Sequence, residues 1–140
     1  MTAKLPGRVL LTVGDPNGIG PEIAVKAAAL LHDTPKLRPV ILGDHHLIEP
    51  LARKIGFDVC QDQDEWGKGA RTLDFHNVPA IGAESLTLGR PSAAGGAATV
   101  AYVQKAIELV QAGVGRAIVA CPHAETSVNA SGRRFSGYPS

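Results

Sequence analysis

The sequence predicts an α/β fold, with a mainly parallel β-sheet and helices packed against it. Three observations support this class. Residues 8–13 are a short apolar run suited to a buried strand, and a glycine-rich turn that opens a helix follows them. Apolar, strand-like runs then alternate with stretches of helical periodicity, which implies crossover connections between parallel strands. The 140 residues, 44% hydrophobic and 19% charged, allow one ordinary domain with a real core.

The N-terminal part is predicted to contain two strand–helix units. After the first strand, Pro21 fits the first helical position, and an acidic residue follows in the positive first turn. This helix is expected over residues 22–31. Residues 39–44 are a second apolar strand, and residues 46–55 form a short helix that Gly56 ends.

The middle of the chain is predicted to be less regular. Residues 57–60 and 72–78 are two further strands, and the second is expected at an edge of the sheet. The polar, glycine-bearing residues 61–70 between them form a surface loop, with Trp66 lying on the surface. Residues 81–90 are expected to be irregular.

The longest helix is predicted over residues 91–111, where apolar residues recur at helical spacing. Gly95 and Gly96 near its start each destabilise a helix by roughly 1 kcal/mol, which is tolerable if another backbone packs closely there. Residues 116–120 are a clearly apolar strand, and a short helix through residues 126–129 follows.

The opening turn, residues 14–22, is the first candidate for a functional role. Gly18 and Gly20 let the backbone approach a neighbour or a ligand without a Cβ clash, and Asp15 and Asn17 lie beside them. A strand, a glycine turn and a helix N-terminus often form one wall of a ligand cleft in α/β enzymes. The acidic residues of the turn disfavour a bare phosphate, and the spacing differs from the GxGxxG dinucleotide fingerprint. Contact with a ligand and simple close packing both remain open.

The second candidate is the segment 121–129, which follows the strand at residues 116–120. Residues directly after a parallel strand lie at the carboxyl edge of the sheet, where clefts form. His123 offers an acid or base, and its polar neighbours offer hydrogen bonds. The same neighbours could instead only cap the next helix. Cys121 as a nucleophile would need a charged partner, and the sequence does not fix one.

Composition excludes several classes of partner. The net charge of +1, with basic and acidic residues interspersed, gives no electrostatic footprint for nucleic acid. The apolar runs are too short to span a membrane. Cys60 and Cys121 lie far apart and form no CxxC pair, so a reducing, cytoplasmic setting is the simplest interpretation. No histidines cluster at a metal-ligand spacing.

Two segments together resemble a known family. The turn VGDPNGIGPE (13–22) resembles the opening of the 4-hydroxythreonine-4-phosphate dehydrogenase family and, more distantly, that of the isocitrate and isopropylmalate dehydrogenases. The segment ACPHAETSVNASGRRFSGYPS (120–140) is similar to the part of that family that carries a substrate-binding loop. It is most similar to the branch that includes the terephthalate dihydrodiol dehydrogenases. The resemblance implies an isocitrate/isopropylmalate dehydrogenase-like fold that is incomplete here.

The resemblance also implies a reaction and its groups. It implies NAD-dependent oxidation of a secondary alcohol in a hydroxy acid, then decarboxylation, with a divalent metal that polarises the oxygen, in a homodimer. Substrate binding is assigned to His123, Ser136, Tyr138 and Pro139. In phosphate-using members a His-Thr pair stands where this chain has Tyr138 and Pro139. Proline has no side-chain donor and tyrosine is neutral near pH 7, which favours a cyclic diol carboxylate as substrate.

The length of the family carries a further expectation. Its chains are considerably longer, and their metal-binding histidines and most NAD contacts come after the point where this sequence stops. Residues 1–140 are therefore expected to be the N-terminal α/β portion of a longer two-domain dehydrogenase, with no catalytic and no metal-binding residue in this segment. The alternative is a catalytically inactive α/β module with a structural or binding role.

Overall fold

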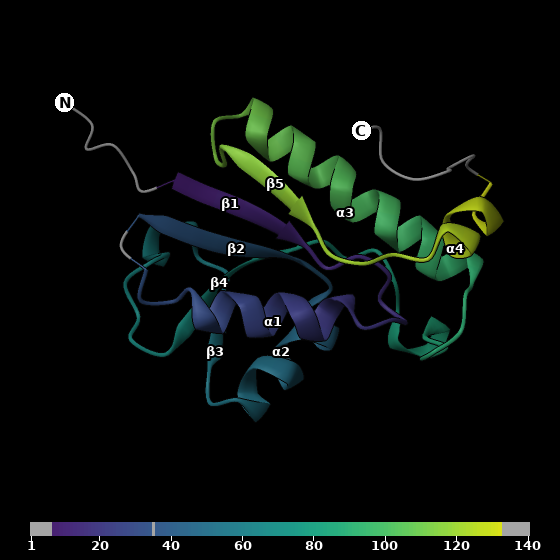
Figure 1. The fold of residues 1–140 in the computed structure, drawn as a ribbon, viewed down its shortest axis with the longest axis horizontal. Helices are drawn as coiled ribbons and strands as arrows, with labels where there is room; N and C mark the ends of the chain where they lie inside the picture. Colours follow the sequence, from purple (N-terminus) through teal and green to yellow (C-terminus); the bar gives the residue numbers. More distant parts are fainter. Residues whose placement is uncertain (1–6, 35, 133–140) are drawn as a thin grey trace.

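A computed structural model describes residues 7–34 and 36–132 and has a five-stranded parallel β-sheet flanked by helices (Figure 1). This architecture confirms the predicted α/β class. In chain order the elements are β1 (Gly7–Thr12), α1 (Gly20–Leu30), β2 (Leu37–Gly43), α2 (His45–Lys54), β3 (Asp58–Cys60), the 3₁₀ turn η1 (Gln63–Glu65), β4 (Thr72–Asn77), the 3₁₀ turn η2 (Ala83–Ser85), α3 (Ala93–Gln111), β5 (Ala117–Ala120) and α4 (Glu125–Ala130).

The strand order is β3-β4-β2-β1-β5, and every neighbouring pair is parallel. From β1 the chain first moves to β2 on one side, and it later crosses back to place β5 on the other side of β1. The direction of winding therefore reverses between β1 and β5. Open α/β sheets bind their ligands at such a switch point, outside the carboxyl ends of the strands.

The helices cover the two faces of the sheet unequally. Helices α1 and α2 contact each other, and they pack beside β2 and β3 respectively. Helix α3 contacts β1, β2 and β5, and α4 packs against α3 (Figure 1). Because parallel crossovers are right-handed, the reversal of winding direction places α3 on the face opposite α1.

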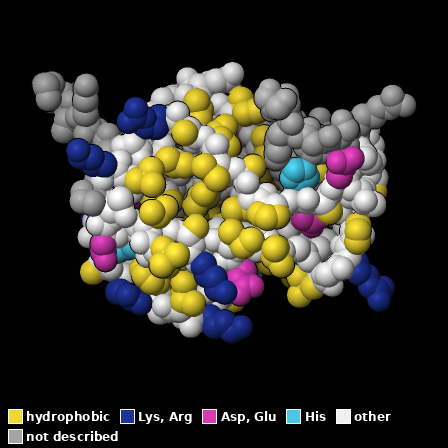
Figure 2. Space-filling view, in the orientation of Figure 1, with side chains coloured by type: hydrophobic (Ala, Val, Ile, Leu, Met, Phe, Trp, Pro, Cys, Tyr) yellow, Lys and Arg dark blue, Asp and Glu magenta, His cyan; other side chains and the backbone are white. Residues whose placement is uncertain are grey.

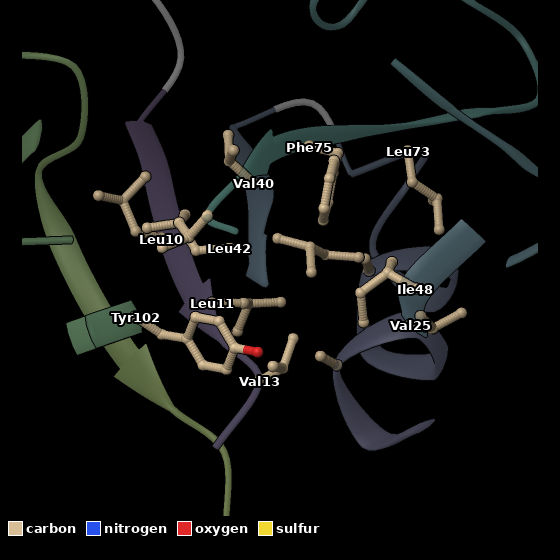
Figure 3. Packing of buried hydrophobic residues seen from close by; sticks show 14 of the residues in the cluster. Leu10, Leu11, Val13, Val25, Val40, Leu42, Ile48, Leu73, Phe75 and Tyr102 are labelled. Atoms are coloured by element: carbon tan, nitrogen blue, oxygen red, sulfur yellow. The ribbon is translucent and has the colours of Figure 1, made fainter. Parts of the chain in front are cut away.

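The core is built around the two central strands (Figure 3). Leu10 and Leu11 of β1, and Ile41 and Leu42 of β2, are all buried although adjacent residues in a strand point to opposite faces. Both faces of the central sheet are therefore covered, as expected for parallel strands that read as continuous apolar runs.

Two expectations for the middle of the chain are wrong. The strand at residues 72–78 is not at an edge, because the three-residue strand β3 pairs outside it. Trp66 is not a surface residue, since it is only 5% exposed. Its indole Nε1 donates to the carbonyl oxygen of Cys60 at 2.9 Å, and the Arg8 guanidinium lies 5.0 Å from the ring centroid. The loop itself lies at the surface as expected, because most of its residues are exposed, but the Trp66 side chain is buried.

Of the two glycines at the start of α3, Gly96 confirms a close backbone approach. A Cβ at Gly96 would lie 1.8 Å from the carbonyl oxygen of Ser127 in α4, a distance that no side chain tolerates. The same end of α3 is capped by Ser92, whose Oγ accepts from the Gly95 amide at 2.9 Å. The loss of helix propensity at Gly96 is therefore offset by packing of α4 directly on α3, whereas a Cβ at Gly95 would meet the side chains of Asn17 and Asp15.

Asp44 joins three parts of the fold. This carboxylate follows β2, is 3% exposed, and accepts hydrogen bonds from the amides of Ala80 and Ile81. Its Oδ2 also accepts from the Tyr102 hydroxyl of α3 at 2.5 Å. Burial, and then the hydrogen bond to Asp44, raise the pKa of Tyr102 far above its usual range, so the hydroxyl remains a donor. A buried carboxylate is thus satisfied entirely by protein groups.

Replacing Tyr102 with phenylalanine tests this connection. The substitution leaves one oxygen of a buried carboxylate without its donor, so we expect the free energy of unfolding to fall by about 1–3 kcal/mol. Urea denaturation would measure it. In an Asp44→Asn background the loss should be clearly smaller. An equal loss in both backgrounds would mean that packing, not this hydrogen bond, accounts for the effect.

Candidate functional site

A pocket of about 340 Å³ lies outside the carboxyl ends of β1 and β5. It is therefore located at the switch point of the sheet. Three segments far apart in the chain line it: the turn after β1, the loop before α3 and the connection after β5. The lining residues are Asp15, Asn17, Gly18, Ile19, Gly89, Arg90, Pro91, Pro122, His123 and Ala124.

The glycines of the opening turn divide between packing and the pocket. A Cβ at Gly20 would lie 2.0 Å from the carbonyl oxygen of Val13, and one at Gly14 would lie 2.0 Å from that of Pro122. These two glycines allow backbone segments to touch. At Gly18 the nearest atom would be 3.6 Å away, which is ordinary contact, and this residue lines the pocket. Close packing is therefore confirmed at Gly14 and Gly20, whereas ligand contact at Gly18 stays a prediction.

Asn17 holds the second wall of the pocket in place. Its side chain is buried, and its Oδ1 accepts from the amide of Thr87 at 2.7 Å. Its Nδ2 donates to the Oγ of Ser92 at 3.1 Å, and its carbonyl oxygen accepts from the amide of Gly89 at 2.7 Å. Asp15 orients the turn in the same way, because its Oδ1 accepts from the Asn17 amide at 2.8 Å. The loop of residues 87–92 is therefore fixed to the opening turn.

The pocket combines apolar walls with two groups that carry or accept positive charge. Ile19, which is 63% exposed, contributes apolar surface together with Pro91, Pro122 and Ala124. Arg90 is exposed and His123 is half-buried at the same pocket. Such a pocket suits a ligand with an apolar body and an anionic group.

Arg90 is the residue that sequence analysis missed. It lies in a stretch without periodicity, where one arginine is not distinctive. Its position in the pocket depends on the hydrogen bonds that Asn17 makes to the surrounding loop. The sequence alone does not show that this loop lies beside the opening turn, so it could not place Arg90 at the pocket.

The predicted site residues fall into three groups. Asp15, Asn17, Gly18 and His123 line the pocket, and Gly20 packs against backbone beside it. Their contact with a substrate stays a prediction. Ser136, Tyr138 and Pro139 lie outside the described residues.

Cys121 has the properties of a structural thiol. It is 6% exposed, and burial raises its pKa, so the thiolate that a nucleophile requires is disfavoured.

Glu22, the other acidic residue of the turn, pairs with Lys26 at 2.9 Å, and this partner lowers the pKa of Glu22. Neither Glu22 nor Cys121 lines the pocket described above.

The described residues do not fit the expected cofactors on their own. Within residues 7–34 and 36–132, no group of three His, Cys, Asp or Glu side chains could hold a metal ion. Gly14 and Gly20 are filled by protein backbone, so the turn offers no glycine cradle for a pyrophosphate. The Asp44 carboxylate already accepts hydrogen bonds from three protein donors, the amides of Ala80 and Ile81 and the Tyr102 hydroxyl.

Among the helices of residues 7–34 and 36–132, none is long and apolar enough to cross a membrane.

A parallel sheet with a pocket at its switch point is the arrangement in which proteins of the α/β class bind their ligands. The family model described as "Pyridoxal phosphate biosynthetic protein PdxA" matches residues 35–140. The chain belongs to this family, as the resemblance in the sequence implies.

Individual relatives agree with this assignment. The chain is 34% identical over 134 residues to a 1,2-dihydroxy-3,5-cyclohexadiene-1,4-dicarboxylate dehydrogenase of Comamonas, covering 95% of this chain and 39% of that protein. A terephthalate 1,2-cis-dihydrodiol dehydrogenase structure from Burkholderia xenovorans is 40% identical with a TM-score of 0.76, over 92% of this chain and 38% of that one. A 4-hydroxythreonine-4-phosphate dehydrogenase structure from Burkholderia phymatum is 27% identical with a TM-score of 0.82, over 96% and 42%. The chain thus spans well under half the length of these relatives.

The two glycines of the turn provide a first test. Gly20→Ala places a methyl group against the backbone of Val13, so we expect it to lower the free energy of unfolding by about 3 kcal/mol or more. Gly18→Ala, two residues away, is the matched control and should change stability by less than about 1 kcal/mol. Thermal or urea denaturation of both variants would decide. Similar losses for both would contradict the division of roles between the two glycines.

Asn17→Ala provides a second test. Loss of its side-chain bonds should release the loop before α3, increasing hydrogen exchange at the Thr87 amide at least about tenfold. Asn77→Ala is the control, because its Oδ1 accepts one amide bond, from His45, at a different place. Exchange at Thr87 should be unchanged in that variant. Unchanged exchange in Asn17→Ala would show that the loop is held by other contacts.

Proposed function

We propose that this chain is the N-terminal α/β portion of an NAD- and divalent-metal-dependent dehydrogenase that oxidises and decarboxylates a hydroxy acid. The observation that carries the proposal is the pocket at the switch point, in a chain that belongs to a family with dehydrogenases among its members. The enzyme is expected to act as a cytoplasmic homodimer. Both cofactors are assigned to parts of the protein other than the described residues.

The pocket favours a cyclic carboxylate over a small phosphorylated substrate. Its apolar walls would cover a ring, and the Arg90 guanidinium is suited to pair with a carboxylate through two parallel hydrogen bonds. Asp15 beside the pocket repels a phosphate dianion more strongly than a carboxylate. The Comamonas relative is named for a cyclohexadiene dicarboxylate, which combines these features. Tyr138 and Pro139, read from the sequence, favour the same substrate class.

The residues of this chain would bind and orient the substrate rather than transfer its atoms. Arg90 would bind the carboxylate, His123 would donate or accept a hydrogen bond at the opposite wall, and Asn17 would keep the two walls at a fixed separation. A fixed geometry of this kind lowers the entropy lost when substrate and reacting groups come together. The pocket is therefore one wall of an active site.

A catalytically inactive α/β module with a binding role is the second candidate. It would use the same pocket to bind a ligand without converting it. The coding DNA after codon 140 separates the two. A reading frame that continues and encodes well-separated histidines supports the enzyme, whereas a stop codon at that point contradicts it.

Arg90→Gln tests the substrate assignment. The variant would be made in a hybrid protein in which residues 1–140 replace the matching segment of the Burkholderia xenovorans enzyme. NAD reduction with divalent metal would be followed on a cyclic diol dicarboxylate and on phosphorylated hydroxythreonine. We expect the KM for the dicarboxylate to rise about 10- to 100-fold, because a charge-assisted hydrogen bond is lost, with a smaller change in kcat.

Arg53→Gln is the matched control, since Arg53 is also an exposed arginine but lies on α2, away from the pocket. It should leave both kinetic constants unchanged. Activity of the hybrid on the phosphorylated compound alone would overturn the substrate class. Equal effects of the two arginine variants would overturn the role of Arg90.

A further inference from the structure

One oxygen of the Asp15 carboxylate is held by the backbone around it. The residue is only 4% exposed, and its Oδ1 accepts from the Asn17 amide at 2.8 Å. A Cβ at Gly95, in the first turn of α3, would lie 2.9 Å from the same Oδ1. The positive end of α3 therefore lies beside this oxygen, which favours a carboxylate there. The side chain has a fixed orientation as a result.

The other oxygen of Asp15, Oδ2, is open to the pocket. No group of the described residues donates a hydrogen bond to Oδ2, since the bond from Asn17 ends at Oδ1. Among the fully enclosed side-chain oxygen and nitrogen atoms of these residues, only Thr12 Oγ1 lacks a partner. Oδ2 is therefore not enclosed, and because Asp15 lines the pocket, we place the opening on the pocket side. An oxygen of this kind is suited to accept a hydrogen bond from a ligand.

The positive charge at the same pocket does not pair with this carboxylate. Arg90 also lines the pocket, but none of the ion pairs among the described residues joins its guanidinium to Asp15. Figure 2 shows the region beyond the carboxyl ends of β1 and β5, to the right, with histidine and acidic side chains among hydrophobic ones and a basic side chain at the margin. The pocket thus has one group for an anion and another for a hydrogen-bond donor.

A hydroxyl group suits the Asp15 oxygen better than an ammonium group does. An ammonium group would be attracted to Asp15, but the Arg90 guanidinium at the same pocket would repel it. A hydroxyl donates a hydrogen bond to a carboxylate and brings no charge of its own. The hydroxy acid that the proposed function assigns to this pocket carries such a group beside its carboxylate.

We propose that Asp15 determines the specificity of the pocket, because its Oδ2 accepts a hydrogen bond from a hydroxyl group of the ligand whose carboxylate binds Arg90. The inference rests on the proposed function and adds a binding role for Asp15 to it. A ligand without the hydroxyl would cover Oδ2 and leave a buried carboxylate oxygen without a donor, which is unfavourable. Sites that are built to bond a hydroxyl discriminate strongly against analogues that lack it.

Asp15→Asn tests the proposal with three probes that differ in one group: cyclohexanecarboxylate, cis-2-hydroxycyclohexanecarboxylate and cis-2-aminocyclohexanecarboxylate. The variant keeps an oxygen for the Asn17 amide but replaces the open acceptor with an amide nitrogen, which only donates. NMR titration of the 140-residue chain without NAD or metal, followed at the Gly18 and Ile19 amides, would give the dissociation constants.

The expected result is a preference that depends on both the hydroxyl and Asp15. The unsubstituted chain should bind the hydroxy acid about 10- to 100-fold more tightly than cyclohexanecarboxylate, because the bond to a carboxylate is charge-assisted. In Asp15→Asn this preference should fall by a factor of about ten or more. Cyclohexanecarboxylate itself should bind Asp15→Asn no more weakly, since a negative charge near its own carboxylate is removed.

Glu22→Gln is the matched control, because Glu22 is the other acid of the turn, pairs with Lys26 and does not line the pocket. It should leave the three dissociation constants unchanged. An equal loss of all three probes in Asp15→Asn would show that Asp15 only supports the turn, and it would overturn the proposal. An unchanged preference in that variant, or no preference in the unsubstituted chain, would overturn it as well. Tightest binding of the amino compound would assign Oδ2 to an ammonium group instead.

The hybrid with the Burkholderia xenovorans enzyme separates this inference from the proposed function. If the hybrid does not reduce NAD while the hydroxyl preference is present and depends on Asp15, the proposed function is wrong and the role of Asp15 stands. If the hybrid oxidises the cyclic diol dicarboxylate and Asp15→Asn does not raise the KM, the reverse is true. We expect the KM to rise about tenfold or more.

Discussion

The structure depends on the backbone contact between the turn after β1 and the segment after β5. The Asp15 amide donates to the carbonyl oxygen of Pro122 at 3.1 Å, and Gly14 leaves no room for a Cβ against the same oxygen. This contact joins the ends of two strands at the point where the winding of the sheet reverses. The pocket, its walls and the position of α1 all follow from it, because Gly20 opens that helix from the same turn.

Local patterns were sufficient to predict most of the elements. Strands β1, β2 and β5 are continuous apolar runs, and α3 has a helical stripe, so each is specified by residues close in the chain. The order of strands in the sheet is not specified in this way. The prediction that residues 72–78 form an edge strand is wrong because the pairing partner is a three-residue strand with almost no pattern. Trp66 is buried by contacts with Cys60 and Arg8, and only the second of these is distant in sequence.

The candidate site was predictable only in part, for a related physical reason. Residues directly after β1 and β5 could be assigned to the cleft because the ends of parallel strands meet at one edge. Arg90 could not, because its loop has no periodicity and is held by Asn17 from 75 residues away along the chain, as the bond to Ser92 shows. Side-chain amides that fix distant loops leave no local pattern. The pocket wall they build is visible only in three dimensions.

The position of β5 beside β1 has a consequence for how the molecule forms during synthesis. Strand β1 can pair with β2 as soon as β2 has left the ribosome, but Val9 must wait for Ala117 before it can pair on its other side. Contacts of such long range form slowly, because a large loop must close first. The β1–α1–β2 unit is thus available long before the pocket exists. Until β5 emerges, the edge of β1 that later pairs with β5 is exposed in the nascent chain. Chaperones could bind this edge, or another strand could pair with it prematurely.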